Sequence, residues 1–133
     1  CLRRVHETWF AWFTNAVRGG QVAPPDRVLR IFTALAESFA APTYRGCAFT
    51  RAVAEISDQT HGAHAVVAEH NARMREFVRE IVVESGASDA DVMTDALLLL
   101  VAGACTNAMR VRGPQPALQA REAAAALLRR PAA

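Results

Sequence analysis

The sequence predicts an all-α domain built from six helices. Apolar residues recur at intervals of three and four along most of the chain, and glycines or prolines separate these stretches. The chain is 52% hydrophobic and 21% charged, a composition that favours a compact, mostly helical body over a disordered segment. Its 133 residues are enough for one domain whose core needs no disulfide or metal.

The first two predicted helices each carry one apolar stripe. The first covers residues 2–17, and the glycine pair at 19–20 ends it. The second begins at the proline pair 24–25 and ends before Pro42. The stripes consist of Leu2, Val5, Trp9, Trp12, Phe13 and Ala16 in the first helix, and of Val28, Phe32, Leu35 and Phe39 in the second.

The middle of the chain predicts a short helix followed by a long one. The short helix covers residues 47–57, after a turn that ends at Gly46. The long helix covers residues 63–85, and Gly86 follows it as a C-terminal stop. The apolar stripe of the long helix consists of Val67, His70, Met74, Phe77 or Val78, and Ile81.

The last two predicted helices differ from the others in composition. The fifth, over 88–112, starts with a capping box of Ser88 and Asp91 and is apolar all round at its centre, so both of its sides need cover. The sixth, over 116–130, is rich in alanine and has little bulk to anchor it within one subunit. A second copy would supply the cover, which predicts a homodimer through a four-helix bundle. Its interface is predicted at Leu97, Leu100, Val101, Ala104, Ala108, Ala120, Ala124 and Leu127.

Charge, cysteine content and hydropathy argue against several classes of protein. A net charge of +2 and a pI of about 8.7 are too mild for a nucleic-acid-binding surface. The three cysteines have no metal-type spacing and fit a reducing cytoplasm, with Cys47 and Cys105 expected as small core residues. The apolar run 96–105 is shorter than the about 20 residues that span a bilayer. We therefore expect a cytoplasmic protein that does not contact membranes.

Metal binding and catalysis receive little support from the residues. His61, His64 and His70 lie close to Glu69, but a metal needs three or four ligands in fixed geometry, and no second acidic or cysteine partner has matching spacing. No phosphate-binding loop, nucleophile elbow or zinc-protease motif occurs. A Cys47–His pair assembled by the fold remains an open alternative. We expect a protein that is not an enzyme, with no catalytic residues, metal or cofactor.

Three short motifs resemble those of a known family. They are the run Arg45-Gly46-Cys47-Ala48-Phe49, Glu55 a few residues later, and Gly103-Ala104 late in the fifth helix. Together they resemble the C-terminal ligand-binding and dimerisation domain of TetR-family transcriptional regulators. Such regulators contact DNA through an N-terminal helix-turn-helix, which is not found in this chain and would be expected before Cys1.

The resemblance also implies a role for each part of the chain. Residues 1–18 would be the helix that links the DNA-binding head to the body, 24–86 the pocket-forming core, and 88–130 the dimerisation helices. A small, largely apolar effector would reposition the heads of a repressor so that they no longer match two operator half-sites. The effector pocket implied in this way is lined by Trp9, Phe13, Phe32, Phe49, His70, Met74 and Phe77.

The residues alone leave other interpretations open. Aromatic side chains at helical spacing also fill ordinary cores, and without the resemblance this is the simpler reading of the pocket set. As a whole, the chain could instead be a helical protein-interaction module, or a small His-containing metal-binding bundle with no link to transcription. A helix-turn-helix in the native sequence before Cys1 would separate these alternatives.

Overall fold

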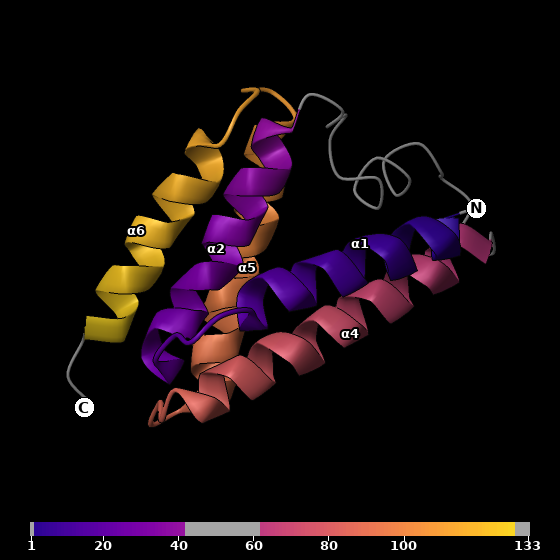
Figure 1. Cartoon of the computed structure of the whole chain (residues 1–133). Coiled ribbons are helices and arrows are strands. Elements are labelled where there is room, and N and C mark those ends of the chain that lie inside the picture. The colour runs from indigo at the N-terminus through magenta and orange to yellow at the C-terminus, as the bar shows by residue number, and fades with distance from the viewer. Residues whose placement is uncertain (1, 42–61, 130–133) are drawn as a thin grey trace.

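The structure, a computed structural model, describes residues 2–41 and 62–129, and this part of the chain is all-α (Figure 1). The predicted fold class is therefore confirmed for the described residues. The predicted third helix, 47–57, lies outside them, so five helices rather than six can be described. They are α1 (Leu2–Arg18), α2 (Pro24–Ala40), α4 (Gly62–Glu84), α5 (Ala90–Ala108) and α6 (Gln115–Arg129).

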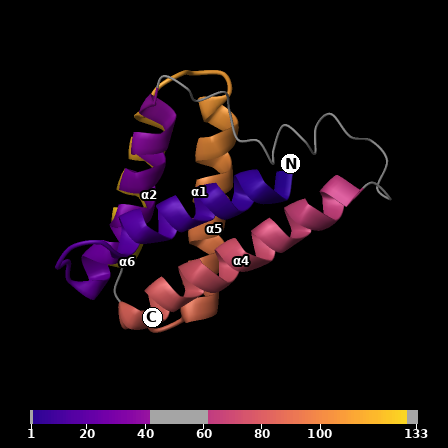
Figure 2. The same ribbon diagram turned by 45° about the vertical axis from the view of Figure 1, so that its right-hand side comes forward.

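The helices form two groups. Helices α2, α5 and α6 lie together, while α1 and α4 cross them and project beyond them as a pair (Figures 1 and 2). Helix α6 packs on both α5 and α2, and α2 also packs on α1 and α4. Along the projecting pair, His6 lies against His70, and Arg18 lies against Glu84. The two helices therefore run in the same direction.

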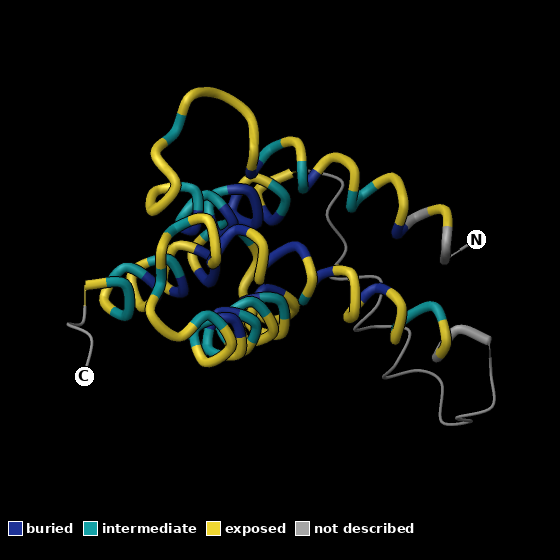
Figure 3. The backbone as a smooth tube through the Cα atoms, turned by 90° about the horizontal axis from the view of Figure 1, so that it is seen from below, coloured by how far each residue is buried: buried dark blue, intermediate teal, exposed yellow. Residues whose placement is uncertain are grey.

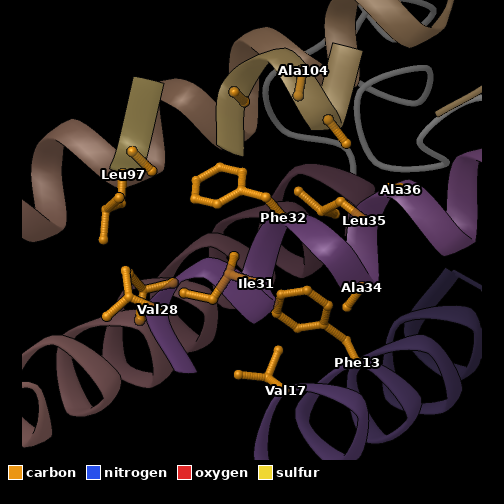
Figure 4. Packing of buried hydrophobic residues seen from close by; sticks show 14 of the residues in the cluster. Phe13, Val17, Val28, Ile31, Phe32, Ala34, Leu35, Ala36, Leu97 and Ala104 are labelled. Atoms are coloured by element: carbon orange, nitrogen blue, oxygen red, sulfur yellow. The ribbon is translucent and has the colours of Figure 1, made fainter. Parts of the chain in front are cut away.

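Helix α2 lies at the centre of the hydrophobic core. Its side chains Val28, Ile31 and Phe32 are completely buried, and Leu35 is 1% exposed. The predicted stripe of this helix is confirmed, because Phe39 is buried as well. Figure 4 shows side chains of α1 and α5, among them Phe13, Val17, Leu97 and Ala104, on either side of it.

Both ends of α5 differ from the prediction. The N-cap is Asp89 rather than Ser88, since the Asp89 carboxylate accepts a hydrogen bond from the Val92 N–H at 3.2 Å. The helix ends at Ala108 rather than at residue 112, because residues 109–114 are needed to reverse the chain before α6. Gly113 has a φ of +114°, a conformation that suits glycine, and so permits this reversal.

Helix α6 is anchored within its own chain, which corrects the prediction that it has too little bulk. Ala117 and Ala124 are completely buried, and Ala120 is 7% exposed. Because alanine side chains are small, α6 approaches α2 and α5 closely enough to bury its own stripe.

The predicted dimer interface stays a prediction, and burial within the single chain bears on which of its residues a second copy could reach. Five of its eight residues are buried within the single chain and cannot offer side-chain surface to a second copy: Leu97, Ala104, Ala108, Ala120 and Ala124. Leu100, Val101 and Leu127 are half-buried. The rotation of α5 turns Leu97, Ala104 and Ala108 toward the core of its own chain.

The outward face of α5 carries other apolar residues. Leu99 is 74% exposed and Val92 is 63% exposed, while Ala96 and Gly103 lie on the same side at helical spacing. Figure 3 shows such exposed positions on the outer sides of helices whose buried positions face one another. An apolar strip of this kind is unusual on a helix exposed to water.

By length and composition alone, α5 is the one helix among residues 2–41 and 62–129 that could cross a membrane. Only 17% of that segment is buried within the chain. A helix that lies at the interface between two subunits can be equally long and equally apolar. The composition of α5 is therefore weak evidence for a membrane span.

Candidate functional site

The contact between α1 and α4 brings together five of the seven residues predicted for the effector pocket. The Trp9 ring stacks on Phe13 with centroids 4.8 Å apart, and Phe13 meets Phe77 edge-on at 5.8 Å. His70 lies 5.8 Å from Trp9, and Met74 is buried between His70 and Phe77 along the same face of α4. We call this contact the α1–α4 seam; it consists of His6, Trp9, Phe10, Phe13, His70, Met74 and Phe77.

Two histidines meet at the N-terminal end of the seam. The Nδ1 atoms of His6 and His70 are 2.7 Å apart, and the residues are only 3% and 8% exposed. Burial, and then the positive charge that His6 would carry, lower the pKa of His70 to about 4. His70 is therefore neutral at pH 7. One Nδ1–H donates to the lone pair of the other Nδ1, so a single proton lies between the rings.

The opposite end of the seam is held by charges. The Arg18 guanidinium donates to Glu84 at 3.1 Å and to Glu80 at 3.2 Å, and Arg27 of α2 donates to Glu84 at 3.0 Å. The Arg18 guanidinium lowers the pKa of the Glu84 carboxyl, which keeps it ionised into the acid range. In addition, the Arg30 guanidinium donates to the Ala16 carbonyl at 2.7 Å, which fixes α2 to the last turn of α1.

The remaining predicted pocket residues lie elsewhere. Phe32 is completely buried in the core on α2 (Figure 4), and Phe49 lies outside the described residues. Two seam residues, His6 and Phe10, were not predicted. They precede Phe13 at helical spacing, at intervals of four and three. A search for apolar residues alone does not count His6, so it does not detect this stripe.

Trp12 corrects the predicted stripe of α1. It is 40% exposed, whereas the next residue, Phe13, is completely buried. Consecutive residues of a helix point about 100° apart, and the rotation of α1 that turns Phe13 into the core leaves Trp12 at its edge. The buried stripe of α1 is instead made by His6, Phe13 and Val17, with Trp9 and Phe10 half-buried beside it.

An open depression lies on the outer edge of the seam. It has a volume of about 190 Å³ and is lined by Phe10, Arg73, Glu76, Phe77 and Glu80. The Arg73 guanidinium lies over the Phe10 ring, 4.7 Å from its centroid. The volume is below the ~300 Å³ at which ligand pockets usually begin, and most of its lining residues are charged. The aromatic side chains of the seam thus pack against one another, and the effector pocket stays a prediction.

Residues suited to hold a metal do not gather in the described part of the chain. Across residues 2–41 and 62–129, no three His, Cys, Asp or Glu side chains converge as metal ligands would. His61 and the side chain of His64 lie outside the described structure. Cys105 packs partly buried against the hydrophobic core, as expected for a small core residue.

Comparisons with known proteins point to one family. No protein-family model and no curated protein matches the chain. Among solved structures, the chain is similar to SCO4454, a TetR-family transcriptional regulator from Streptomyces coelicolor, with a TM-score of 0.83 and 26% sequence identity. The match covers 96% of this chain and 63% of that one, so the chain spans less than two thirds of the length of the regulator.

Proposed function

Because the chain has the fold of a TetR-like C-terminal domain, we propose that it is the effector-sensing and dimerisation domain of a TetR-like repressor. Such a domain is regulatory and not an enzyme. The observation that carries the dimerisation half of the proposal is the exposed apolar face of α5, with Leu99 at its centre. The observation that supports the sensing half of the proposal is the α1–α4 seam.

The geometry of α5 supports a close helix partner. Val92, Ala96, Leu99 and Gly103 follow one another at intervals of four and three, and so form one stripe along the helix. A Cβ atom added to Gly103 would meet nothing within 4 Å, so this side of the helix is open. Large and small residues alternate along the stripe, as packing of ridges into grooves requires. A second copy of α5 and α6 would complete a four-helix bundle across this face.

Sedimentation tests this dimer. Leu99→Arg would place two charges in the interface, at a cost of about 3 kcal/mol or more, so the dimer should weaken by at least about a hundredfold. Val83→Arg is the matched control, because Val83 is 51% exposed on a different helix, α4. We expect Val83→Arg to stay dimeric and Leu99→Arg to become a folded monomer. A dimer in both variants would mean that the interface lies elsewhere.

For sensing, we propose that a small, largely apolar molecule inserts between α1 and α4. The seam would offer aromatic rings as walls and His70 as the polar group, the combination usual in ligand sites. Because α1 would lead to the DNA-binding head, separating α1 from α4 would change the distance between two heads. A complete switch from 1:99 to 99:1 needs an affinity difference of about 10⁴ between the two arrangements.

A thermal-shift screen of small apolar compounds would identify the effector, since a ligand of the folded state raises the melting temperature. Trp9→Ala should then weaken binding of the compound found, whereas Trp12→Ala, at a position that is 40% exposed, should not. Equal weakening by both variants would remove the seam as the binding site.

We propose that DNA is contacted only through a domain that precedes this one in a cytoplasmic regulator. The native protein with its preceding segment should bind an operator and release it when the effector is added. The exposed face of α5 also fits the second candidate, a helical module that binds another protein. If the segment before Cys1 holds no helix-turn-helix, the second candidate replaces the first.

A further inference from the structure

The two ends of the α1–α4 seam are held by different chemistry. We infer that the His6–His70 contact is a proton-operated latch, which opens the N-terminal ends of α1 and α4 when both imidazoles become protonated. The latch itself follows from the contact; its consequence for DNA binding rests on the proposed function.

The proton count of the pair explains why acid would open it. In the neutral pair, one Nδ1–H fills the 2.7 Å gap and donates to the lone pair of the other ring. A first added proton leaves this hydrogen bond in place, because an imidazolium can still donate to a neutral imidazole. A second added proton removes the last acceptor, so two N–H groups and two positive charges face each other. The closed contact cannot hold that state.

The direction of the pH effect follows from His70. Its pKa is about 4 in the closed seam, against an ordinary value of 6.5, so the open form binds the proton more tightly. Closing is therefore unaffected above pH 6.5 and becomes weaker as the pH falls toward 4. The difference between the two pKa values corresponds to at most about a 300-fold shift of the equilibrium toward the open form.

Few charged groups surround the pair in the described part of the chain. Arg4 and Glu7 flank His6 along α1, and Glu69 and Arg73 flank His70 along α4. The third helix that packs on the seam, α2, places Arg27 and Arg30 at the opposite end. The lowered pKa of His70 has burial as its first cause and His6 as its second. Within the described residues, burial and the second imidazole are therefore the causes to which the response is assigned.

The charged end of the seam would act as the hinge. Arg18 joins Glu84 there, and the pKa of Glu84 is lowered, so this ion pair persists in the range where the histidines titrate. Acid would then release the N-terminal half of α1 while its last turn stays attached. In the proposed regulator, this is the half that leads to the DNA-binding head.

Hydrogen–deuterium exchange of the chain between pH 7.5 and 4 tests the latch. After correction for intrinsic rates, amides of α1 before Phe13 should exchange faster by up to about 300-fold as the pH falls, while those of Val28 to Leu35 in the core should not. In the double variant His6→Gln and His70→Gln, which keeps hydrogen-bonding groups but cannot titrate, the change should disappear. Equal acceleration in the core would mean general acid unfolding and would overturn the proposal.

Two further measurements keep the latch testable if the variant does not fold. The first is an NMR titration of the wild-type histidines, in which His70 should titrate near pH 4. A His70 pKa near the ordinary value of 6.5 would overturn the proposal. The second is addition of Zn²⁺ at pH 7.5. If micromolar zinc raises the melting temperature of the wild type but not of the double variant, the pair is a metal ligand, and the proton latch is wrong. Neither measurement depends on the dimer or on DNA.

Discussion

Replacing Leu97 with alanine tests the packing of α5 against the core. The Leu97 side chain is completely buried, and it belongs to the same hydrophobic cluster as Phe32 (Figure 4). Truncating a buried leucine costs about 2–5 kcal/mol, from lost burial and from the cavity left behind. At about 2.1 cal/mol/K per residue, the 133-residue chain has an unfolding entropy of about 0.28 kcal/mol/K. A loss of about 3 kcal/mol should therefore lower the melting temperature by about 11 °C.

Leu99→Ala is the matched control, because Leu99 is on the same helix but 74% exposed. In a monomer, its truncation should change the stability by less than about 0.5 kcal/mol. Calorimetry over a hundredfold range of protein concentration would separate the two effects. The loss at Leu97 should not depend on concentration, and the loss at Leu99 should grow where the dimer forms. If Leu97→Ala costs less than about 1 kcal/mol, or both variants lose the same amount in the monomer, the orientation of α5 described above is wrong.

Five further substitutions test single features. Ala104→Arg should unfold the chain rather than yield a folded monomer, since the position is 3% exposed; circular dichroism would show the loss of helix. Asp89→Ala should cost about 1 kcal/mol in urea unfolding, and Ser88→Ala should cost almost nothing. Gly86→Ala should cost about 1–2 kcal/mol by the same assay, because Gly86 has a φ of +82°. Glu84→Gln should cost at most about 1 kcal/mol, and the difference should shrink in 1 M salt.

The sequence is sufficient to predict where local patterns decide the structure. The stripe of α2, from Val28 to Phe39, is a repeat of large apolar residues between prolines, and the ends of α1, α2, α4 and α6 lie close to their predicted positions. Such a pattern depends only on neighbours in the chain. Its errors are small shifts, as at α5, where Ser88 and Asp89 are both good caps and differ by one residue.

Features that depend on how helices meet could not be predicted in this way. Nothing in the sequence indicates that His6 and His70 touch, because this requires the parallel register of α1 and α4. Likewise, the uniform apolar character of α5 does not reveal which side faces the core, so Leu97 and Leu99 look alike in the sequence. The alanines of α6 were read as lack of bulk, whereas close approach of three helices buries Ala117, Ala120 and Ala124.

The rotation of α1 that buries Phe13 and exposes Trp12 has a practical consequence. Trp9 and Trp12 are the two tryptophans of the chain, and one lies in the seam while the other faces water. After Trp12→Phe, all indole fluorescence comes from the ring that stacks on Phe13, so emission reports directly on the seam. After Trp9→Phe, the remaining ring is a reference on the same helix. The two single-tryptophan variants thus supply a fluorescent probe of the seam and a reference for it.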